Sequence, residues 1–570
     1  MPIAILGLDL NDYNTSAALA VDGRIVAAAQ EERFSREKRT RRFPAQAMAY
    51  CLRRADLTLG ELTAVAISAN PAIYLENLSP VQSERARFRG ELLYAPVNYL
   101  LGGTPGADAR SAFLHIDEAR LGGLNIHYLT HHDCHAATAF LLSPFDSGAI
   151  LSIDGFGEKE TTVFYRGEGA TLRRLQSVEF PHSVGCFYSA LTAFLGLQPD
   201  RHEWKLMAAA AHGDPQRYLG PMRSLLHYQG NGRFEIDLPY FNYYQFHRPG
   251  LFTPKLVELL GPPYTPEMEP DARFFDLAAA TQQATEELVF ALLRDLAAMA
   301  PDRRLCLTGG VAMNCVLNGK ITAETPFEEV FVPPMPDDSG TSVGAALLAG
   351  ALHYGLPRRE PLRHNYLGPA FTDEEIRREL ERDRLPFSQP ADVAEAAAAR
   401  LAAGQLVGWF QGGLEFGDRA LGNRSILADP RDAAAPARIN ALVKDRRPYQ
   451  PFAPSILAER AAAWFENATP SPFMEKTFRV RPAQAARIPA VLGPDGHARL
   501  QTVTPEQNGA FHRLIGAFEK STGVPLVLNT SFNLRGEPIV CTVRDAIRTF
   551  FASGLDALFV GPYCVEKSPR

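Results

Sequence analysis

The sequence has few of the features that mark secreted or membrane-bound proteins. Its seven cysteines form no CxxC pair and follow no regular spacing, which argues against a disulfide framework and against a structural zinc ribbon. Residues 1–9 lack the positively charged segment and the cleavage site of a signal peptide. No apolar stretch approaches membrane-spanning length. These absences predict a protein of the reducing cytoplasm that has no membrane partner.

An excess of positive charge is also lacking. The chain has 58 Lys and Arg residues against 64 Asp and Glu residues, and its formal net charge is -6. This balance argues against a general nucleic-acid binder. The basic run at residues 33–42 is a local exception. An isolated run of this kind predicts a solvated face, with the entrance for an anionic ligand as the alternative.

Two similar strand units occur in the N-terminal half. Residues 3–10 predict a buried strand that carries Asp9 near its end, and a hairpin turn follows at Asp22-Gly23. A similar order recurs with a strand at residues 149–153, which is followed by Asp154-Gly155. The repetition indicates an internal duplication. Units of this kind build the actin/hexokinase-like fold, in which nucleotide and metal bind between the halves.

A Pro-rich, charged break at residues 355–361 marks the expected domain boundary. At 570 residues the chain is too long for one ordinary core, so we expect one domain over residues 1–355 and another over residues 356–570. The second domain is predicted to be α/β as well, from one helix and two strands at residues 391–403, 406–410 and 524–529.

Four residues form a candidate metal site. His131 and His135 stand four positions apart, so both imidazoles can lie on one face of a helix. Asp154 follows the next strand and Asp338 precedes a helix of small residues, so both carboxylates could reach the same cleft. Two imidazoles and two carboxylates suit Fe(II), Mn(II) or Zn(II) better than Mg(II), which prefers oxygen ligands. The alternative is a histidine pair that only caps or packs.

Glycines and basic residues predict anion binding in the C-terminal half. Residues 412–425 combine glycines with Arg419 and Arg424, whose guanidinium groups suit a compact polyanion. A salt-bridged surface is the alternative, but few acids lie between Arg419 and Arg447. Further polar residues would extend this patch, from an expected helix and from a strand end: Lys444, Arg446 and Arg447, and residues 529–533.

Nine motifs occur in a specific order along nearly the whole chain. They are EERFSR at 31–36, HHDCH at 131–135, IDGFG at 153–157, KLMAA at 205–209, GGVAMN at 309–314, RALGNRS at 419–425, PFAP at 451–454, RLQTV at 499–503 and NTSFN at 529–533. Together they resemble the NodU/CmcH-type O-carbamoyltransferases, which modify nodulation factors, cephems and other antibiotics.

This resemblance implies two active sites. A C-terminal YrdC-like domain would condense carbamoyl phosphate with ATP, used with Mg(II), to give carbamoyl adenylate and pyrophosphate. The N-terminal actin/hexokinase-like domain would hold that adenylate on a metal, typically iron. It would then pass the carbamoyl group to a hydroxyl of a small-molecule acceptor, as in antibiotic biosynthesis.

The resemblance also implies roles for individual residues. His131, His135, Asp154 and Asp338 would be the metal ligands. The adenylate pocket would be lined by Gly309, Gly310 and Asn314, with Lys205 nearby. Carbamoyl phosphate and the ATP phosphates would be held by Arg419, Arg424, Lys444, Arg499 and Ser531, beside Asn529 and Asn533 of the same strand end.

The chain departs from the family pattern near the expected acceptor. Many relatives carry His-Asp where this chain has Tyr13-Asn14. If that histidine assists proton removal, another group must do so here, and Tyr13 and His132 are the candidates. Gln450 also stands where an arginine is common, and Arg447 stands where an acid is common.

Alternative functions, the acceptor site and the oligomeric state stay open at this point. A tRNA-modifying enzyme would need a basic RNA-binding surface, and the sequence shows no sign of one. A hydrogenase-maturation carbamoyl enzyme would need zinc-finger and acylphosphatase segments, which the sequence does not show either. A non-catalytic nucleotide-binding scaffold is a further alternative, against which the intact metal and arginine motifs argue. The aromatic stretches at residues 74–99 and 240–252 could line the acceptor site or simply pack. The chain is expected to be a monomer or a homodimer.

Overall fold

The chain forms two compact units. The computed structural model describes residues 2–11, 13–71, 73, 111–116, 123–245, 248–444 and 446–567. The first unit comprises Met1–Ala28 and Arg41–Leu362, and the second comprises Ala29–Thr40 and Arg363–Arg570. A short segment near the N-terminus is thus a part of the second unit. The aromatic stretch at 74–99 lies outside the described residues.

The first unit contains a six-stranded sheet around β1 (Ala4–Asp9). Its strand order is β3-β2-β1-β4-β6-β5, where β2 is antiparallel to β1, and β4 and β6 continue parallel. The remaining strands are β2 (Ser16–Val21), β3 (Arg24–Gln30), β4 (Ala64–Ile67), β5 (Ser111–Ile116) and β6 (Leu124–Leu129). Asp22 and Gly23 both have positive φ, which suits the tight hairpin turn predicted there.

The second sheet of this unit repeats the plan of the first. Its order is β13-β12-β7-β8-β9, with β8 antiparallel to β7, and β12 and β13 parallel to β7. The strands are β7 (Ser147–Ile153), β8 (Glu160–Glu168), β9 (Thr171–Glu179), β12 (Arg304–Thr308) and β13 (Glu329–Phe331). A central strand, an antiparallel hairpin on one side and two parallel strands on the other occur in both sheets. The predicted internal duplication is therefore present in the fold.

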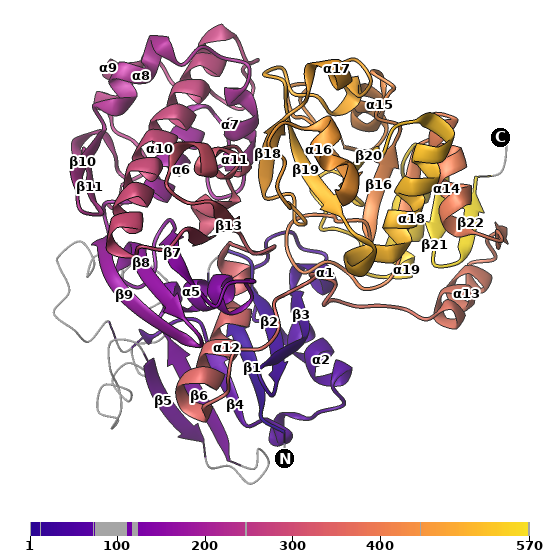
Figure 1. Cartoon of the computed structure of the whole chain (residues 1–570), viewed down its shortest axis with the longest axis horizontal. Helices are drawn as coiled ribbons and strands as arrows, with labels where there is room; N and C mark the ends of the chain where they lie inside the picture. Colours follow the sequence, from indigo (N-terminus) through magenta and orange to yellow (C-terminus); the bar gives the residue numbers. More distant parts are fainter. Residues whose placement is uncertain are drawn as a thin grey trace. The chain divides into compact units, whose positions relative to one another are not determined.

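Two helices lie close together beside these sheets (Figure 1). They are α5 (His131–Leu141) and α12 (Thr341–Tyr354). A Cβ on Gly7 of β1 would come within 1.9 Å of the Ser342 carbonyl oxygen, and a Cβ on Gly344 would come within 1.9 Å of the Cys134 carbonyl oxygen. Glycine at both positions therefore lets α12 pack directly against β1 and against α5.

Among the described residues, the rest of the first unit contains helices, loops and a small hairpin, β10 (Leu226–Gly230) and β11 (Arg233–Ile236). Its helices are α2 (Ala45–Arg54), α6 (Val184–Phe194), α7 (Glu203–Ala210), α8 (Gln216–Arg223), α9 (Pro254–Leu260), α10 (Ala272–Met299) and α11 (Cys315–Glu324). A 3-10 turn spans Gly310–Met313, because the Asn314 side chain caps α11 and starts a new helix there.

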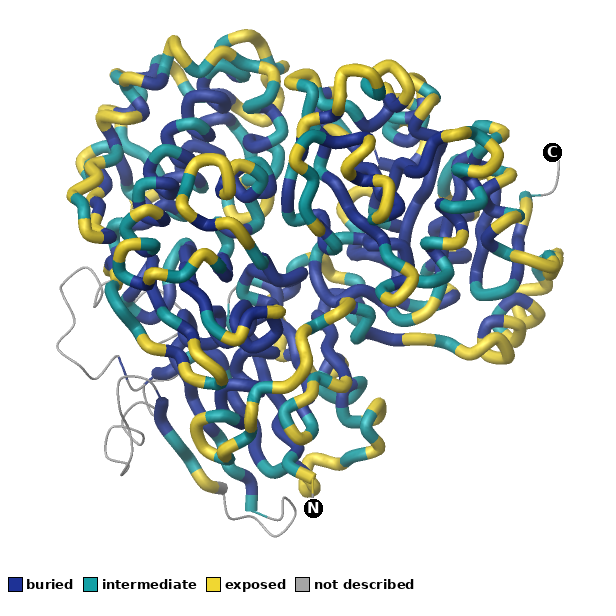
Figure 2. The backbone as a smooth tube through the Cα atoms, in the orientation of Figure 1, coloured by how far each residue is buried: buried dark blue, intermediate teal, exposed yellow. Residues whose placement is uncertain are grey.

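The second unit is built on one mixed sheet of nine strands in the order β14-β22-β21-β15-β16-β20-β17-β19-β18. The strands are β14 (Phe387–Ser388), β15 (Val407–Phe410), β16 (Arg424–Ala428), β17 (Ala453–Leu457), β18 (Lys476–Arg479), β19 (His497–Val503), β20 (Leu526–Ser531), β21 (Ala557–Val560) and β22 (Tyr563–Glu566). Figure 2 shows these strands as largely buried, in keeping with an extensive apolar core.

Helices surround this sheet. They are α1 (Glu32–Ser35), α13 (Asp373–Arg382), α14 (Val393–Ala402), α15 (Ala435–Ile439), α16 (Ala461–Trp464), α17 (Pro482–Ala485), α18 (Pro505–Thr522) and α19 (Val543–Phe551). The helix expected to carry Lys444, Arg446 and Arg447 is wrong in part. A π-helix, Asn440–Lys444, ends at Lys444, and the two arginines follow outside it.

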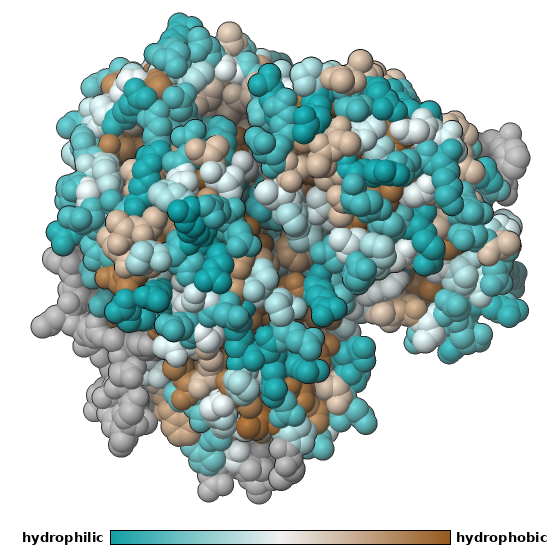
Figure 3. All heavy atoms as spheres, viewed as in Figure 1, coloured by the Kyte–Doolittle hydropathy of each residue, from teal (hydrophilic) through white to brown (hydrophobic). Residues whose placement is uncertain are grey.

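The surface agrees with the balanced composition of the chain. On the face shown in Figure 3, hydrophilic residues predominate and apolar residues are interspersed among them. Among the described residues, the helices are too short or too polar to cross a membrane.

Candidate metal centre and anion-binding residues

The metal-site histidines lie in the first turns of α5. All eleven residues of this helix are buried, so each of its polar side chains needs an internal partner. Glu158 caps the helix, because its carboxylate accepts hydrogen bonds from the backbone N–H of His131 at 3.1 and 3.2 Å. The same carboxylate accepts the backbone N–H of Asn70 at 2.7 Å. The predicted placement of both histidines on one helix face is confirmed.

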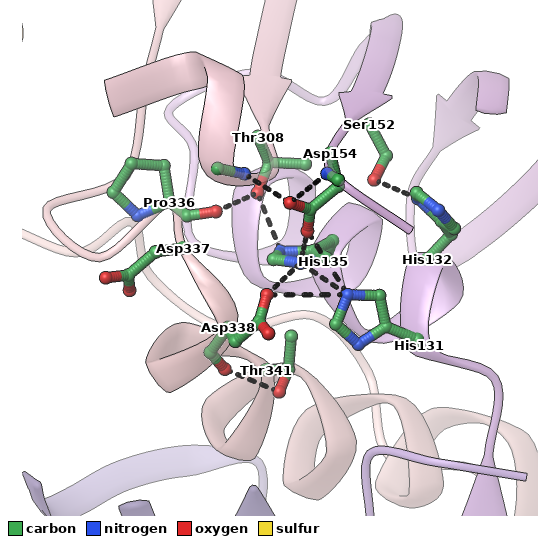
Figure 4. A network of polar contacts seen from close by, with 12 residues as sticks. His131, His132, His135, Ser152, Asp154, Thr308, Pro336, Asp337, Asp338 and Thr341 are labelled. Carbon is green, nitrogen blue, oxygen red and sulfur yellow. Dashed lines mark hydrogen bonds and ion pairs between the residues drawn. The ribbon is translucent and has the colours of Figure 1, made fainter. Parts of the chain in front are cut away.

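Two carboxylates meet these imidazoles (Figure 4). Asp154 directly follows β7, and its Oδ2 lies 3.2 Å from His131 Nε2 and 2.9 Å from His135 Nε2. Asp338 begins the 3-10 turn Asp338–Gly340 that leads into α12, and its Oδ1 lies 3.5 and 3.4 Å from the same two nitrogens. The two Nε2 atoms are 3.0 Å apart. The structure thus brings together four residues that are up to 207 positions apart in the sequence.

The donor atoms fit a transition-metal ion. All four ligand atoms lie within 4.8 Å of one another. Tetrahedral ligands at about 2.1 Å from a metal stand about 3.4 Å apart, which is close to the separations found here. Two imidazole nitrogens and two carboxylate oxygens suit Fe(II), Mn(II) or Zn(II).

Electrostatics show how strongly the carboxylates act on the histidines. Burial opposes the charged form of His135, but Asp154 and Asp338 outweigh it and raise its pKa to about 9. The pKa of His131 is raised in the same way, since Asp338 and Asp154 overcome burial. Conversely, the two histidines overcome burial and hold the pKa of Asp154 well below its usual value. The site therefore attracts positive charge, as protons or as a metal ion.

His132, a candidate for proton removal, is engaged elsewhere. Its Nε2 lies 3.0 Å from the carbonyl oxygen of Glu160, which can only accept, so Nε2 carries the proton. Its Nδ1 then accepts from the Ser152 hydroxyl at 2.7 Å. Burial and the charges of His131 and His135 lower the pKa of His132 well below its usual value. Both ring nitrogens are used in the core, so this structure does not favour His132 as the base.

The glycine pair after β12 helps to hold Asp154. The backbone N–H of Gly310 donates to Asp154 Oδ1 at 3.1 Å, and Gly155 N–H donates to the same oxygen at 2.7 Å. Gly309 has φ +90°, and a Cβ there would come within 2.2 Å of the Ile153 carbonyl oxygen. Glycine is therefore required at 309 by the approach of β7, whatever ligand binds nearby.

Asn314 and Lys205 both have protein partners. The Asn314 amide pairs with the amide of Gln282 in both directions, at 2.9 and 3.1 Å, while it caps α11. Lys205 lies on α7, where its Nζ is 3.0 Å from His202 Nε2. Their adenylate-pocket roles stay predictions.

The β1–β2 connection lies beside the metal centre. Asn11 contacts His131, with its amide nitrogen 3.1 Å from His131 Nδ1. Asn14 is fully buried, and neither atom of its amide has a hydrogen-bond partner among the described residues. Tyr13 is half-buried in the same connection. Its catalytic role stays a prediction.

In the second unit, three of the predicted residues meet. Lys444 is buried, and its Nζ donates to the Ser531 hydroxyl at 3.2 Å and to Asn533 Oδ1 at 2.8 Å. It also donates to the backbone carbonyls of Ser531 and Asn533. Burial, Arg446 and Lys38 lower the pKa of Lys444 well below its usual value. A nearby anion would favour its charged form.

Arg419 and Arg424 occupy very different environments. Arg424 is fully buried, and its guanidinium donates to four backbone carbonyls, those of Gln411, Gly412, Asn423 and Pro369. It also lies over the ring of Phe410, with Cζ 3.6 Å from the centroid. These contacts give Arg424 a structural role in the loop. Arg419 is half-buried, which leaves it better placed to meet an anion.

The glycine-rich segment at 412–425 has an internal anion of its own. Glu415 is buried, and its Oε1 accepts the backbone N–H groups of Leu421, Asn423 and Arg424 at 2.8, 2.8 and 3.2 Å. In the structure, the Glu415 carboxylate takes these three and fixes the loop that carries Arg419.

The basic run at 33–42 is only in part the solvated face that its isolation predicted, since Lys38, Arg41 and Arg42 are exposed. Arg33 is 2% exposed and donates to the Gly417 carbonyl at 2.8 Å, because residues 29–40 belong to the second unit. Arg39 lies 4.0 Å from Asp418. Lys38 is close enough to Lys444 to affect its pKa. This segment therefore adds cations near Lys444 and Asp418, while a role as the entrance for an anionic ligand stays a prediction.

Two further predicted residues lie on strands of the same sheet. Asn529 on β20 is buried and donates to the Ala420 carbonyl at 3.2 Å and to Ser455 Oγ at 3.0 Å. It thereby supports the backbone next to Arg419. Arg499 on β19 is half-buried. Burial and Arg419 lower the pKa of Arg446 to about 10, which shows how closely the cations gather.

Sequence reasoning missed the residues that support these sites. Asn11, Glu158 and Thr308 act on the histidine helix or its ligands, and Glu415 and Lys38 act on the anion-binding loop. Only the basic run around Lys38 carried a signal in the sequence. Asn11, Glu158 and Thr308 are single polar residues whose partners lie far away along the chain, whereas Glu415 binds N–H groups of its own segment.

Comparison with known proteins gives matches to carbamoyltransferase models in both halves of the chain. The family models described as Carbamoyltransferase N-terminus and Carbamoyltransferase C-terminus match residues 4–347 and 398–567. Nodulation protein NolNO of Sinorhizobium fredii is 37% identical over 97% of this chain and 79% of its own length. Nodulation protein NolO of Bradyrhizobium diazoefficiens is 40% identical over 77% of this chain and 79% of its own. An uncharacterised protein of Synechocystis sp. is 36% identical over 99% of this chain and 97% of its own length.

Proposed function

Since the chain belongs to the carbamoyltransferase family and is an enzyme of that class, we propose that it is an ATP-dependent O-carbamoyltransferase with two successive reactions. In the first, carbamoyl phosphate, water and ATP, used with Mg(II), give carbamoyl adenylate, pyrophosphate and inorganic phosphate. In the second, the carbamoyl group passes to a hydroxyl of a small natural-product molecule, with release of AMP. The single observation that carries the proposal is the four-donor cluster at 131, 135, 154 and 338 within this family.

The first reaction is assigned to the second unit, as a YrdC-like domain. Carbamoyl phosphate and ATP are both anionic, so they repel one another unless cations lie between them. Arg419, Arg446, Lys444 and Lys38 gather close enough to affect one another's pKa values or that of Asp418. Such a cluster offsets the repulsion and positions the reactants. Water cleaves the O–P bond of carbamoyl phosphate and inorganic phosphate leaves. An oxygen of the resulting carbamate then attacks the α-phosphorus of ATP, from which pyrophosphate leaves.

The second reaction is assigned to the first unit, as an actin/hexokinase-like domain. His131, His135, Asp154 and Asp338 would hold the metal ion, for which we propose Fe(II), with Mn(II) and Zn(II) as alternatives. When bound, the ion supplies Lewis-acid polarisation of the carbamoyl or phosphate oxygens. The protein's own part is to fix these four donors: Glu158 anchors the start of α5, and Gly155 and Gly310 orient Asp154.

The acceptor hydroxyl must lose a proton as the carbamoyl group arrives. Tyr13 is the proposed group for this step, because it stands in the position of the usual histidine and belongs to the connection that contacts His131 through Asn11. Lys205, Gly309, Gly310 and Asn314 are proposed to border the adenylate. We further propose a cytoplasmic location, a monomer or homodimer, and no nucleic-acid or membrane partner.

One assay tests the adenylate reaction. Protein with ATP, Mg(II) and carbamoyl phosphate should release pyrophosphate, and Arg419→Ala should lower the rate at least tenfold. The control is Arg377→Ala, because Arg377 pairs with Glu381 on the exposed side of α13. Formation of ADP without pyrophosphate would contradict the mechanism.

A second variant separates the two reactions. His135→Ala should lose tightly bound metal and acceptor carbamoylation while it retains pyrophosphate release. If the variant keeps both the metal and the transfer activity, the assignment of the metal centre is wrong.

A further inference from the structure

The ring of His131 is held from both sides. Its Nε2 faces the carboxylates of Asp154 and Asp338, at 3.2 and 3.5 Å. Its Nδ1 faces the side-chain amide of Asn11, which lies 3.1 Å away. Asn11 is itself fixed, since its backbone N–H donates to the buried carboxylate of Asp9 at 3.0 Å. One amide therefore sets the orientation of this imidazole from behind.

The position of one proton decides what this amide must do. A metal ion at Nε2 uses the lone pair of that nitrogen, so the ring proton must sit on Nδ1. A proton on Nδ1 requires an acceptor, which the Asn11 amide provides through its oxygen. Without metal, Nε2–H can donate to Asp154, and Nδ1 can then accept from the amide nitrogen. Half a turn of the Asn11 amide exchanges the two arrangements.

We propose that Asn11 is a positioning residue of the metal centre, whose amide oxygen accepts the Nδ1 proton of His131 when the ion is bound. The inference deepens the proposed function, since it rests on metal binding at the same four residues. It also explains why an amide suits this place, because it can accept or donate without adding charge.

His135 has a counterpart to Asn11. Its Nδ1 lies 3.4 Å from the Thr308 hydroxyl oxygen, and that hydroxyl lies 3.3 Å from the Pro336 carbonyl, to which it donates (Figure 4). Because the Thr308 proton is directed to a carbonyl, its oxygen is left to accept from His135 Nδ1. Each imidazole thus has an uncharged polar group behind it: the Asn11 amide, whose nitrogen lies 3.1 Å from His131 Nδ1, and the Thr308 hydroxyl, 3.4 Å from His135 Nδ1.

The inference is tested by Co(II) affinity rather than by activity. Full-length protein is titrated with Co(II) against a chelator, and the visible absorption of the bound ion reports its coordination. Asn11→Leu should weaken Co(II) binding by about 10- to 100-fold, the usual effect of removing such a partner. Asn11→Asp, whose carboxylate also accepts the Nδ1 proton, should bind at least as tightly as the unmodified protein and keep its spectrum.

A matched control is available in the same unit. Asn125 Oδ1 accepts the Nδ1 proton of His115 at 2.8 Å, and neither residue belongs to the ligand cluster. Asn125→Leu should leave Co(II) affinity unchanged. Circular dichroism and thermal unfolding of each variant report whether the fold is kept.

The outcomes separate this inference from the proposed function. Co(II) affinity of Asn11→Leu within threefold of the unmodified protein would overturn the inference and leave the metal centre standing. Binding by Asn11→Asp that is more than tenfold weaker would overturn it as well, even if Asn11→Leu fails to fold. An unmodified protein that binds no Co(II), Fe(II) or Zn(II) would overturn both the metal centre and the inference.

Discussion

Metal affinity should rise steeply with pH between 7 and 9. In the metal-free site, Asp154 and Asp338 raise the pKa of His135 to about 9 against the burial that opposes its charge. At neutral pH this histidine therefore carries a proton that a metal ion must displace. Asp154 adds no such cost, because its pKa is held well below the usual value.

The expected magnitude follows from the release of one proton. Below pH 9, each unit of pH should tighten the apparent dissociation constant by up to tenfold, so the change from pH 7 to pH 9 is roughly 100-fold, or about 2.7 kcal/mol. Above pH 9 the dependence should flatten. His131, whose pKa is also raised, steepens the curve in the part of this range where it still carries a proton.

The stability of the metal-free protein should change in the opposite direction. A histidine whose pKa is higher in the folded state than in the unfolded state stabilises the fold below the unfolded value, near 6.5. That contribution is lost as pH rises through about 9. The metal-free protein should therefore unfold more easily at pH 9 than at pH 6.5, by at most about 3 kcal/mol from this group. Bound metal should offset the loss.

Two measurements check this reasoning. Chelator competition with Zn(II) at half-unit steps of pH gives the affinity, corrected for protonation of the chelator and for hydrolysis of the ion. Thermal unfolding with and without metal gives the stability. His135→Ala is the control, and its remaining affinity should depend less on pH. A flat affinity curve for the unmodified protein between pH 7 and pH 9 would refute the assigned charge state of the site.

The remaining predictions concern the second unit and the support of α5. Arg424→Met should destabilise the protein by about 3 kcal/mol or more, because four buried carbonyls lose a charged donor. Arg419→Met should change stability little but slow pyrophosphate release. Equal stability of the two variants would contradict this distinction. Glu415→Gln should keep the fold but loosen the loop, seen as faster amide hydrogen exchange at residues 421–424, and unchanged exchange would count against it. Arg174→Met should lower the melting temperature, since Arg174 pairs with the buried Asp133 at 2.8 Å, and a melting temperature equal to that of the unmodified protein would argue against this support.

Much of the fold could be predicted because it follows from local patterns. The strand that ends at Asp9, the hairpin at Asp22-Gly23 and the repeated unit before Asp154 all carry alternating or continuous apolar residues with turn residues at fixed places. The two histidines of α5 follow from helical spacing alone. Helix limits were less predictable where a side chain started a new helix, as Asn314 does.

The roles of arginines were harder to predict from sequence. Arg419 and Arg424 stand in one motif and look equivalent, yet one is half-buried and the other is enclosed by carbonyls. Which of two neighbouring guanidinium groups points into the core depends on packing around them. The sequence also did not show that Glu415, which precedes the motif, accepts backbone N–H groups of Leu421, Asn423 and Arg424.

The sequence by itself determined the type of chemistry: a histidine pair at helical spacing, carboxylates at strand and helix ends, a basic glycine-rich loop and the family motifs. These features depend on neighbours along the chain, so they can be predicted from the periodicity of the backbone. Only the tertiary structure decided which groups meet. It brought Asp154 and Asp338 to the histidines, placed Asn11 behind His131, and made residues 29–40 a part of the second unit. Such contacts arise from packing between distant segments, which no local pattern encodes.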